Sequence, residues 1–166
     1  RLLKAAKDIS ENSSVKIVLL AGPSSSGKTT TTSKLSLYIK GFGKNPKMIS
    51  MDDYFVDRDE TPIDENGDPD FESLKTVDLK LFDSQIAKML KGEEVIIPTF
   101  DFIEGKKRYK KKMKLEANDI LLIEGIHALN PKVLDNIESS RKFKIYLSAL
   151  NEINIDDHNR FPTTDN

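Results

Sequence analysis

Runs of apolar, often β-branched residues recur along the chain and are separated by polar or helically patterned stretches. One run spans Val15 to Ala21, and two others span Asp119 to Glu124 and Phe143 to Leu147. Unbroken runs of this kind are typical of strands buried on both faces, as in a parallel sheet covered by helices. Lys47 to Met51 and Glu94 to Ile97 are weaker strand candidates.

A helical stripe of apolar positions lies between the two weaker strand candidates. Its members, at helical spacing, are Leu79, Phe82, Ile86, Met89 and Leu90. Asp78 is placed to begin this helix and Gly92 to end it. Strands that alternate with helices predict an α/β fold of three layers, a parallel sheet with helices on both faces.

Two polar stretches do not fit this alternation. Asp57 to Asp70 is acidic and rich in turn-forming residues, which predicts a loop. Lys106 to Lys114 has seven Lys or Arg in nine residues and is predicted to form an exposed hairpin or flap. Because the chain as a whole is nearly neutral, and Tyr109 alone supplies an aromatic ring in this run, a nucleic-acid surface is disfavoured.

Composition narrows the classes of protein that the chain can represent. The 166 residues contain 26 Lys and Arg against 27 Asp and Glu, which excludes a strongly basic or strongly acidic protein. With 0 Cys, the chain has no disulfide, thiol nucleophile or Cys-based zinc site, and a cytoplasmic location is expected. No apolar run approaches the roughly 18 residues that span a bilayer. We expect residues 1–14 to be a helical lead-in from a larger protein and residues 15–166 to be one domain.

A glycine-rich motif follows the first apolar run. Gly22 to Thr29 reads GPSSSGKT, which fits G-x-x-x-x-G-K-[ST] between a buried strand and a helix that begins near Lys28. Backbone N–H groups of such a loop surround a phosphate, the lysine contacts the β- and γ-phosphates, and the Thr29 hydroxyl ligates Mg²⁺. The expected nucleotide-binding residues are Gly22, Ser24, Ser25, Ser26, Gly27, Lys28, Thr29 and Thr30.

Carboxylates follow two other predicted strands. Glu124 ends the apolar run that begins at Asp119, where it can reach the Mg²⁺ shell or cap the next turn. Asp52 and Asp53 follow the strand candidate Lys47 to Met51, and one of them can accept a proton from an attacking hydroxyl. A turn or N-cap role suits Asp53 better than Asp52. The guanine-reading N-K-x-D motif of GTPases is absent from the sequence.

Four motifs in order resemble the uridine kinase and phosphoribulokinase family of P-loop kinases, and the uridine kinase-like branch most closely. They are GPSSSGKT, SMDDYF (Ser50 to Phe55), PTFDF (Pro98 to Phe102) and LLIEGIHALNP (Leu121 to Pro131). The resemblance covers the chain from about Lys16. It implies a P-loop NTPase-type fold, ATP and Mg²⁺ as cofactors, and transfer of a phosphoryl group to the 5′-hydroxyl of a nucleoside such as uridine or cytidine.

The resemblance also implies roles for residues outside the phosphate loop. Asp52 is the expected catalytic base, together with Lys28 as the catalytic cation. Glu72 is expected to bind the ribose hydroxyls, with Asp70 as a nearby rival. Phe100 and Phe102 are expected to sandwich the pyrimidine, although two aromatic residues at i and i+2 of an extended segment equally suit a core.

The chain departs from the family pattern in two places. Family members have a base-reading His shortly after the paired aromatics, and the corresponding position here is Gly105. An arginine-rich lid follows the fifth strand in the family, and we expect this chain to end at Asn166 before it. Only Arg160 and Arg141 remain as candidate phosphate-neutralising cations in that region. A kinase for another small hydroxyl substrate and a nucleotide-binding regulatory module therefore stay open, as does homo-oligomerisation.

Two histidines complete the candidates. His127 lies two residues after Gly125 and is expected to be able to face the site. His158 follows Asp156 and Asp157, and this triplet is interpreted as surface because adjacent residues rarely converge on one metal ion.

Overall fold

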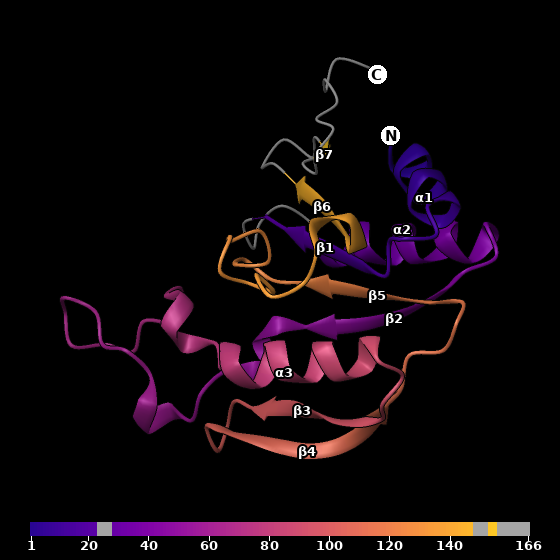
Figure 1. Ribbon diagram of the computed structural model, residues 1–166. Coiled ribbons are helices and arrows are strands. Elements are labelled where there is room, and N and C mark those ends of the chain that lie inside the picture. Colours follow the sequence, from indigo (N-terminus) through magenta and orange to yellow (C-terminus); the bar gives the residue numbers. More distant parts are fainter. Residues whose placement is uncertain (23–27, 148–152, 156–166) are drawn as a thin grey trace. The chain divides into compact units, whose positions relative to one another are not determined.

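The computed structural model describes residues 1–22, 28–147 and 153–155 of the chain, and Figure 1 shows the arrangement of their elements. The chain divides into two compact units. Unit 1 comprises Arg1–Ile49 and Glu116–Asn166, and unit 2 comprises Ser50–Leu115. Each unit is described separately below.

A mixed sheet of five strands in the order β2-β5-β1-β6-β7 forms the centre of unit 1 (Figure 1). β1 (Ile17–Ala21) pairs in parallel with β5 (Asp119–Glu124) and with β6 (Lys142–Leu147). β2 (Asn45–Ser50) lies beyond β5, and the short β7 (Ile153–Ile155) is antiparallel to β6. The apolar runs in the sequence therefore predicted the four parallel strands, while β7 was not predicted.

Two helices pack against this sheet. α1 (Leu2–Glu11) and α2 (Lys28–Gly41) contact each other, and together with the strands they form one apolar cluster. Its buried members include Ala5, Ala6 and Ile9 of α1, Leu35 and Ile39 of α2, and Val18, Leu20, Ile120, Leu122, Phe143 and Ile145 of the sheet. Four consecutive threonines open α2, so burial of its apolar side chains overrides the low helix propensity of its first turn.

Polar contacts fasten the edge strand β2 to β5 at the amino end of β5. The Asp119 carboxylate accepts hydrogen bonds from the Asn45 side chain (2.9 Å) and the Glu116 backbone N–H (2.8 Å) and forms an ion pair with Lys47 (2.9 Å). Burial would raise the pKa of Asp119, but these three donors outweigh it and the pKa lies below its usual value. The carboxylate therefore stabilises the fold in its ionised form.

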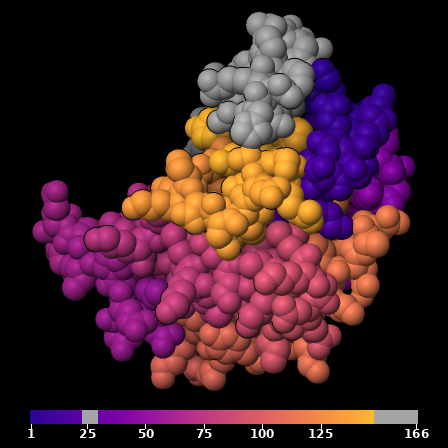
Figure 2. All heavy atoms as spheres, in the orientation of Figure 1, coloured from indigo at the N-terminus to yellow at the C-terminus, as the bar shows by residue number. Residues whose placement is uncertain are grey.

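Unit 2 combines one helix, a β-hairpin and three short 3₁₀ turns. The turns are η2 (Met51–Tyr54), η3 (Arg58–Glu60) and η4 (Leu74–Thr76), the helix is α3 (Leu79–Leu90), and the hairpin pairs β3 (Val95–Asp101) with β4 (Lys106–Met113). In Figure 2 the atoms of α3 and of the hairpin pack against each other. The strand candidate Glu94 to Ile97 is thus a strand, but it belongs to a separate antiparallel sheet and not to the parallel one.

The ends of α3 lie where the sequence placed them. The Asp78 carboxylate accepts a hydrogen bond from the Leu81 backbone N–H (3.1 Å) and caps the first turn. Gly92 follows the last turn with a φ of +84°, a conformation that glycine adopts without strain. The buried face of α3 packs against η2 through Phe82, whose ring meets that of Tyr54 edge to face at 5.0 Å.

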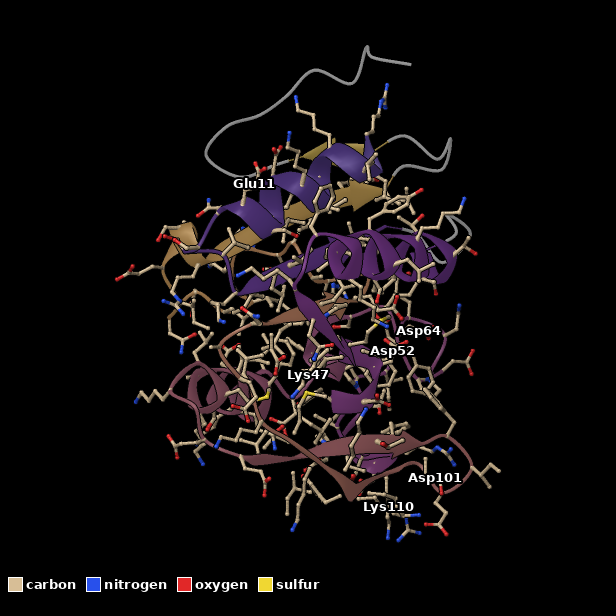
Figure 3. All side chains as sticks on the ribbon, turned by 90° about the vertical axis from the view of Figure 1, so that its right-hand side faces the viewer. Glu11, Lys47, Asp52, Asp64, Asp101 and Lys110 are labelled. Carbon is tan, nitrogen blue, oxygen red and sulfur yellow. The ribbon has the colours of Figure 1, made fainter. Side chains whose placement is uncertain are left out.

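The basic run forms β4, and its side chains alternate between two faces. On the inner face, Lys107 donates to the Phe55 carbonyl (3.1 Å) and pairs with Asp78, and Met113 is buried. On the outer face, Arg108 pairs with Glu104. Figure 3 shows Lys110 extending away from the hairpin. The prediction of an exposed hairpin is confirmed, and exposed lysines also protect its free edge from pairing with another strand.

The acidic stretch from Asp57 to Asp70 is a loop, as predicted, with η3 at its start and an isolated bridge between Ile63 and Pro69. Within the described ranges, no helix has the length and apolar character needed to cross a membrane.

Candidate functional site

The phosphate-loop motif of unit 1 lies between β1 and α2. β1 ends at Ala21, Gly22 follows it in a buried position, and α2 begins at Lys28. The predicted order of strand, loop and helix is therefore present. The predicted roles of Ser24, Ser25, Ser26 and Gly27, and of the Lys28 and Thr29 side chains, fall outside the described residues. Thr30 is exposed in the first turn of α2.

Glu124 lies at the same sheet edge as Gly22. It is the last residue of β5 and pairs in register with Leu20, and the Gly125 backbone N–H donates to the Leu20 carbonyl (3.1 Å). The end of β5 is therefore adjacent to the residue pair that leads from β1 into the phosphate loop. Carboxyl ends of parallel strands are where open α/β sheets bind ligands.

A threonine of α2 holds the Glu124 side chain. The Thr32 hydroxyl, which is fully buried, donates a hydrogen bond of 3.1 Å to Glu124 Oε2. This contact connects the amino-terminal part of α2 to the carboxyl end of β5. Among the described contacts Glu124 caps no turn, and the role of Glu124 toward Mg²⁺ stays a prediction. The sequence analysis did not single out Thr32. The one sign of its role in the sequence was a hydroxyl-bearing residue about one helical turn after the motif.

Two further candidates of unit 1, His127 and Arg141, lie at opposite ends of the sheet. His127 lies in the turn after β5, where the described residues offer no hydrogen-bond partner to its buried Nε2. Arg141 precedes β6 at the opposite sheet end, since its carbonyl accepts from Lys16 N–H (3.0 Å) ahead of β1. The expectation that Arg141 could neutralise phosphate charge is therefore not supported by its position. His158 and Arg160 fall outside the described residues.

In unit 2, the carboxylates of η2 have different environments. Asp52 is exposed, and its backbone N–H donates to the Ser50 hydroxyl (3.3 Å), which caps η2. Asp53 is half-buried and accepts a hydrogen bond from the Phe100 backbone N–H (3.4 Å). Burial raises the pKa of Asp53, and the charge of Asp52 adds to this effect, while the Phe100 N–H and Lys111 oppose it. Asp53 therefore fastens η2 to β3, and Asp52 is left accessible.

Four phenylalanines from three segments form an aromatic cluster: Phe55, Phe71, Phe100 and Phe102. The Phe55 ring lies in the middle, stacked with Phe71 at 6.0 Å and edge to face with Phe100 at 5.5 Å and Phe102 at 6.1 Å. Phe55 and Phe100 are buried, whereas Phe71 is 40% exposed and Phe102 is 58% exposed. Two rings of the cluster are therefore open to a ligand and two support them.

The cluster changes the expected role of the paired aromatics. Phe100 and Phe102 share a face, as the period of two predicts, but their rings touch at 4.9 Å and 70° to each other. No flat ligand lies between rings arranged in this way, so the expected sandwich is not formed by this pair. Phe100 belongs to the core, and Phe102 with Phe71 provides the exposed aromatic surface. Phe55 and Phe71 were missed, although each lies within three residues of a predicted site carboxylate, Asp52 and Glu72 respectively.

Asp70 and Glu72, the two candidates for binding the ribose hydroxyls, are the sequence neighbours of Phe71 in the aromatic cluster. Asp70 Oδ1 accepts the Glu72 backbone N–H (3.1 Å), and its carbonyl accepts the Thr76 hydroxyl (2.9 Å). The Glu72 carboxylate is exposed and forms no hydrogen bond with the described residues. Asp70 thus shapes the turn, and Glu72 is the carboxylate free to meet a ligand.

Gly105, the position of the expected base-reading histidine, is packed against Arg58. Gly105 has a φ of +71°, and a Cβ added there would lie 2.7 Å from Arg58 Cβ. The Arg58 backbone N–H donates to the Gly105 carbonyl (2.8 Å). A side chain at position 105 would therefore require both backbone strain and displacement of Arg58.

Comparisons with known proteins find similar sequences. The model of the "Phosphoribulokinase / Uridine kinase family" matches residues 17–158. A uridine kinase of Borrelia duttonii is 31% identical over 139 residues, covering 84% of this chain and 63% of its own length. One of Macrococcus caseolyticus is 28% identical over 133 residues, covering 80% of this chain and 62% of its own length. The chain therefore spans less than two thirds of these relatives.

Solved structures share the fold. A possible uridine kinase from Bacillus stearothermophilus has a TM-score of 0.63 at 24% identity, covering 80% of this chain and 70% of that one. A putative fructose transport system kinase from Silicibacter sp. TM1040 has a TM-score of 0.64 at 19% identity, covering 88% and 73%. The predicted P-loop kinase fold, a parallel sheet flanked by helices, is confirmed. Because the family model matches most of its length, this chain belongs to the phosphoribulokinase and uridine kinase family.

Proposed function

We propose that the chain is the core of a kinase that transfers the γ-phosphoryl group of ATP to the 5′-hydroxyl of a pyrimidine nucleoside. The observation that carries the proposal is the edge of the sheet in unit 1. There, β1 leads through Gly22 into the phosphate-loop motif. Glu124 is the last residue of the adjacent strand β5 and accepts a hydrogen bond from the Thr32 hydroxyl. Curated relatives at 28% and 31% identity are named uridine kinases, which supports a nucleoside as acceptor.

The phosphate side of the proposed reaction belongs to unit 1. Backbone N–H groups of the motif and the start of α2 would bind the phosphates, and Lys28 would neutralise the β- and γ-phosphate charge. The residues present fit Mg²⁺, because Glu124 presents a carboxylate at the strand end with one oxygen held by Thr32. Thr29 and Glu124 would hold this ion, which when bound offsets charge on the phosphate oxygens.

The acceptor side of the proposed reaction belongs to unit 2. The exposed carboxylate of Asp52 would accept the proton of the attacking hydroxyl. Glu72 would accept hydrogen bonds from the ribose hydroxyls, since its carboxylate is exposed and uncommitted to the described residues. The exposed rings of Phe71 and Phe102 would receive the base, because aromatic faces stack on flat rings.

The proposal is tested by a phosphoryl-transfer assay with the protein. ATP, Mg²⁺ and uridine or cytidine are incubated with it, and the nucleoside 5′-monophosphate is measured by chromatography. Replacing Asp52 with Asn keeps the shape of the side chain and removes its basicity, so turnover should fall by about 100-fold with nucleotide affinity retained. Asp59→Asn in η3 is the matched control and should leave turnover unchanged.

Formation of ADP with another small alcohol, and no monophosphate from either nucleoside, would contradict the nucleoside proposal. Equal turnover by wild type and Asp52→Asn would contradict the role of Asp52 as base.

A further inference from the structure

A buried polar pair connects η2 to α3. The Tyr54 side chain is fully buried, and its hydroxyl donates a hydrogen bond of 2.6 Å to Gln85 Oε1. Gln85 belongs to the buried face of α3. Burial raises the pKa of the Tyr54 hydroxyl, and the nearby charge of Asp53 raises it further, so the hydroxyl keeps its proton and is the donor of this bond.

The amide of Gln85 makes a second bond that extends the connection to β3. Its Nε2 donates to the Ile96 backbone carbonyl at 2.8 Å. One carboxamide therefore accepts from η2 and donates to β3 at the same time. A methionine would fill a similar volume without taking an amide out of water, so packing alone does not call for a glutamine at this position.

η2 depends on tertiary contacts of this kind for its shape. A single 3₁₀ turn has poorer hydrogen-bond geometry than an α-helix. Tyr54 fixes the end of the turn, because its carbonyl also accepts from the Asp78 backbone N–H at 2.7 Å, and Asp53 is held by the Phe100 backbone N–H. Asp52 is the exposed residue of the turn. The direction of its side chain is therefore set by how its neighbours are held.

Both of these side-chain attachments are made to the same strand. The Gln85 amide binds β3 near its first residue, and the Asp53 carboxylate binds it near its last. β3 leads directly to Phe102, an exposed ring of the aromatic cluster. The attachments therefore hold Asp52 in a fixed relation to the surface that is proposed to receive the nucleobase.

We infer that Gln85 is a positioning residue for phosphoryl transfer: by joining Tyr54 to β3 it orients η2, and with it the carboxylate of Asp52. In this role it acts through Asp52 and not by contact with a substrate. The inference rests on the proposed function, because it assumes that Asp52 accepts the proton of the attacking hydroxyl. It adds to that function a buried residue that sets the direction of the catalytic base.

Steady-state kinetics of nucleoside phosphorylation test the inference. Gln85→Met keeps the volume of the side chain and removes both hydrogen bonds, so kcat should fall about tenfold through misplacement of the catalytic base. KM for ATP and for the nucleoside should stay within about twofold, because the proposed substrate contacts are unchanged. Met89→Leu, one turn further along the buried face of α3, is the matched control and should leave kcat unchanged.

Two double variants separate positioning from stability. Adding Tyr54→Phe to Gln85→Met removes the hydroxyl that has lost its acceptor, so the denaturation midpoint should move back toward wild type while kcat stays low. Adding Gln85→Met to Asp52→Asn should leave kcat at the value of Asp52→Asn, because the side chain that Gln85 orients has lost its basicity. A further fall of kcat in that background would show that Gln85 does not act through Asp52 and would overturn the inference.

The outcomes also separate the inference from the proposed function. An unchanged kcat in folded Gln85→Met, or a kcat that recovers together with stability in Tyr54→Phe/Gln85→Met, overturns the inference and leaves the proposed function standing. A raised KM for the nucleoside with unchanged kcat does the same, since it would assign Gln85 to support of the aromatic cluster. If Gln85→Met does not fold, the double variant with Tyr54→Phe gives the kinetic comparison. If wild type forms no nucleoside 5′-monophosphate from ATP, both are overturned.

Discussion

The two units differ in how they are built and in how their candidate residues are held. In unit 1, Gly22, Glu124 and Thr32 are fixed by a buried parallel sheet and by one helix that starts inside the motif. In unit 2, the accessible carboxylates and rings come from η2, the turn at residues 70–72 and the tip of a hairpin, and contacts between side chains and backbone hold them.

This difference shows why the residues proposed to bind phosphate in unit 1 centre on one short motif, whereas those proposed to bind the acceptor in unit 2 come from several segments. Phosphate binding relies on backbone N–H groups and a helix terminus, which a single short motif supplies. Recognition of a specific acceptor needs side chains from several directions, which only tertiary packing supplies. Unit 2 is accordingly the unit in which single substitutions should alter selectivity.

The largest effect on unit 2 should come from the central ring of the aromatic cluster. Phe55→Ala removes a buried side chain with three aromatic partners, which should lower the free energy of unfolding by about 3–5 kcal/mol. Chemical denaturation measures the loss. Phe102→Ala, at an exposed ring of the same cluster, is the control and should cost less than about 1 kcal/mol. Similar losses in both variants would show that the cluster has no buried centre.

The next effect is the pH dependence of the unfolding free energy, which should differ between Asp119 of unit 1 and Asp53 of unit 2. The pKa of Asp119 lies below its usual value of 3.8, so its ionised form stabilises unit 1 above that pH, and the benefit disappears as the pH falls through the lowered pKa. Asp119→Asn should therefore be most destabilising near neutral pH and least so in acid. The pKa of Asp53 lies above 3.8, so the folded protein holds this proton more strongly and stability falls as the pH rises through this range.

Asp53→Asn should consequently gain stability relative to wild type as the pH rises above 3.8, because the amide oxygen can still accept the Phe100 N–H without a buried charge. Unfolding free energies of both variants across the acid range give the comparison. The difference in unfolding free energy from wild type should change with pH in opposite directions in the two variants. Changes in the same direction would contradict the environments assigned to these carboxylates.

The smallest effect concerns the contact between α2 and β5. Thr32→Val keeps the shape of the side chain but removes the donor to Glu124, which should cost about 1 kcal/mol of stability and raise the Mg²⁺ concentration needed for ATP binding several-fold. Thr31→Val, the neighbouring threonine, is the matched control. A Mg²⁺ requirement that is unchanged in folded Thr32→Val would argue against Glu124 as a residue of the metal shell.

Elements with strong local signals could be predicted from the sequence. The strands of the parallel sheet, the start and end of α3, the loop after Asp57 and the basic hairpin all follow from apolar periodicity, capping residues and charge. β7 could not be predicted, because three residues carry no period. The strand near Glu94 was recognised, but its placement in a second sheet depends on pairing with a distant, lysine-rich partner that apolar patterning does not reveal.

The candidate site was predicted unevenly for the same reason. Glu124 follows from its place at the end of an apolar run, whereas Thr32 depends on which face of α2 meets β5. The period of two put Phe100 and Phe102 on one face, but it could not show that their rings touch or that Phe71 stacks on Phe55. The contact between Arg58 and Gly105 joins residues far apart in the chain and left no trace in local patterns.

Crossed binding titrations test most directly the central claim that unit 1 binds ATP and unit 2 binds the nucleoside. ATP with Mg²⁺, and cytidine separately, are titrated into wild type, Lys28→Ala and Phe102→Ala by calorimetry. Lys28→Ala should weaken ATP binding by about 100-fold and leave cytidine affinity within about twofold. Phe102→Ala should weaken cytidine binding on the order of tenfold and leave ATP affinity unchanged. Loss of cytidine binding in folded Lys28→Ala, or of ATP binding in folded Phe102→Ala, would contradict the division of the two substrates between the two units.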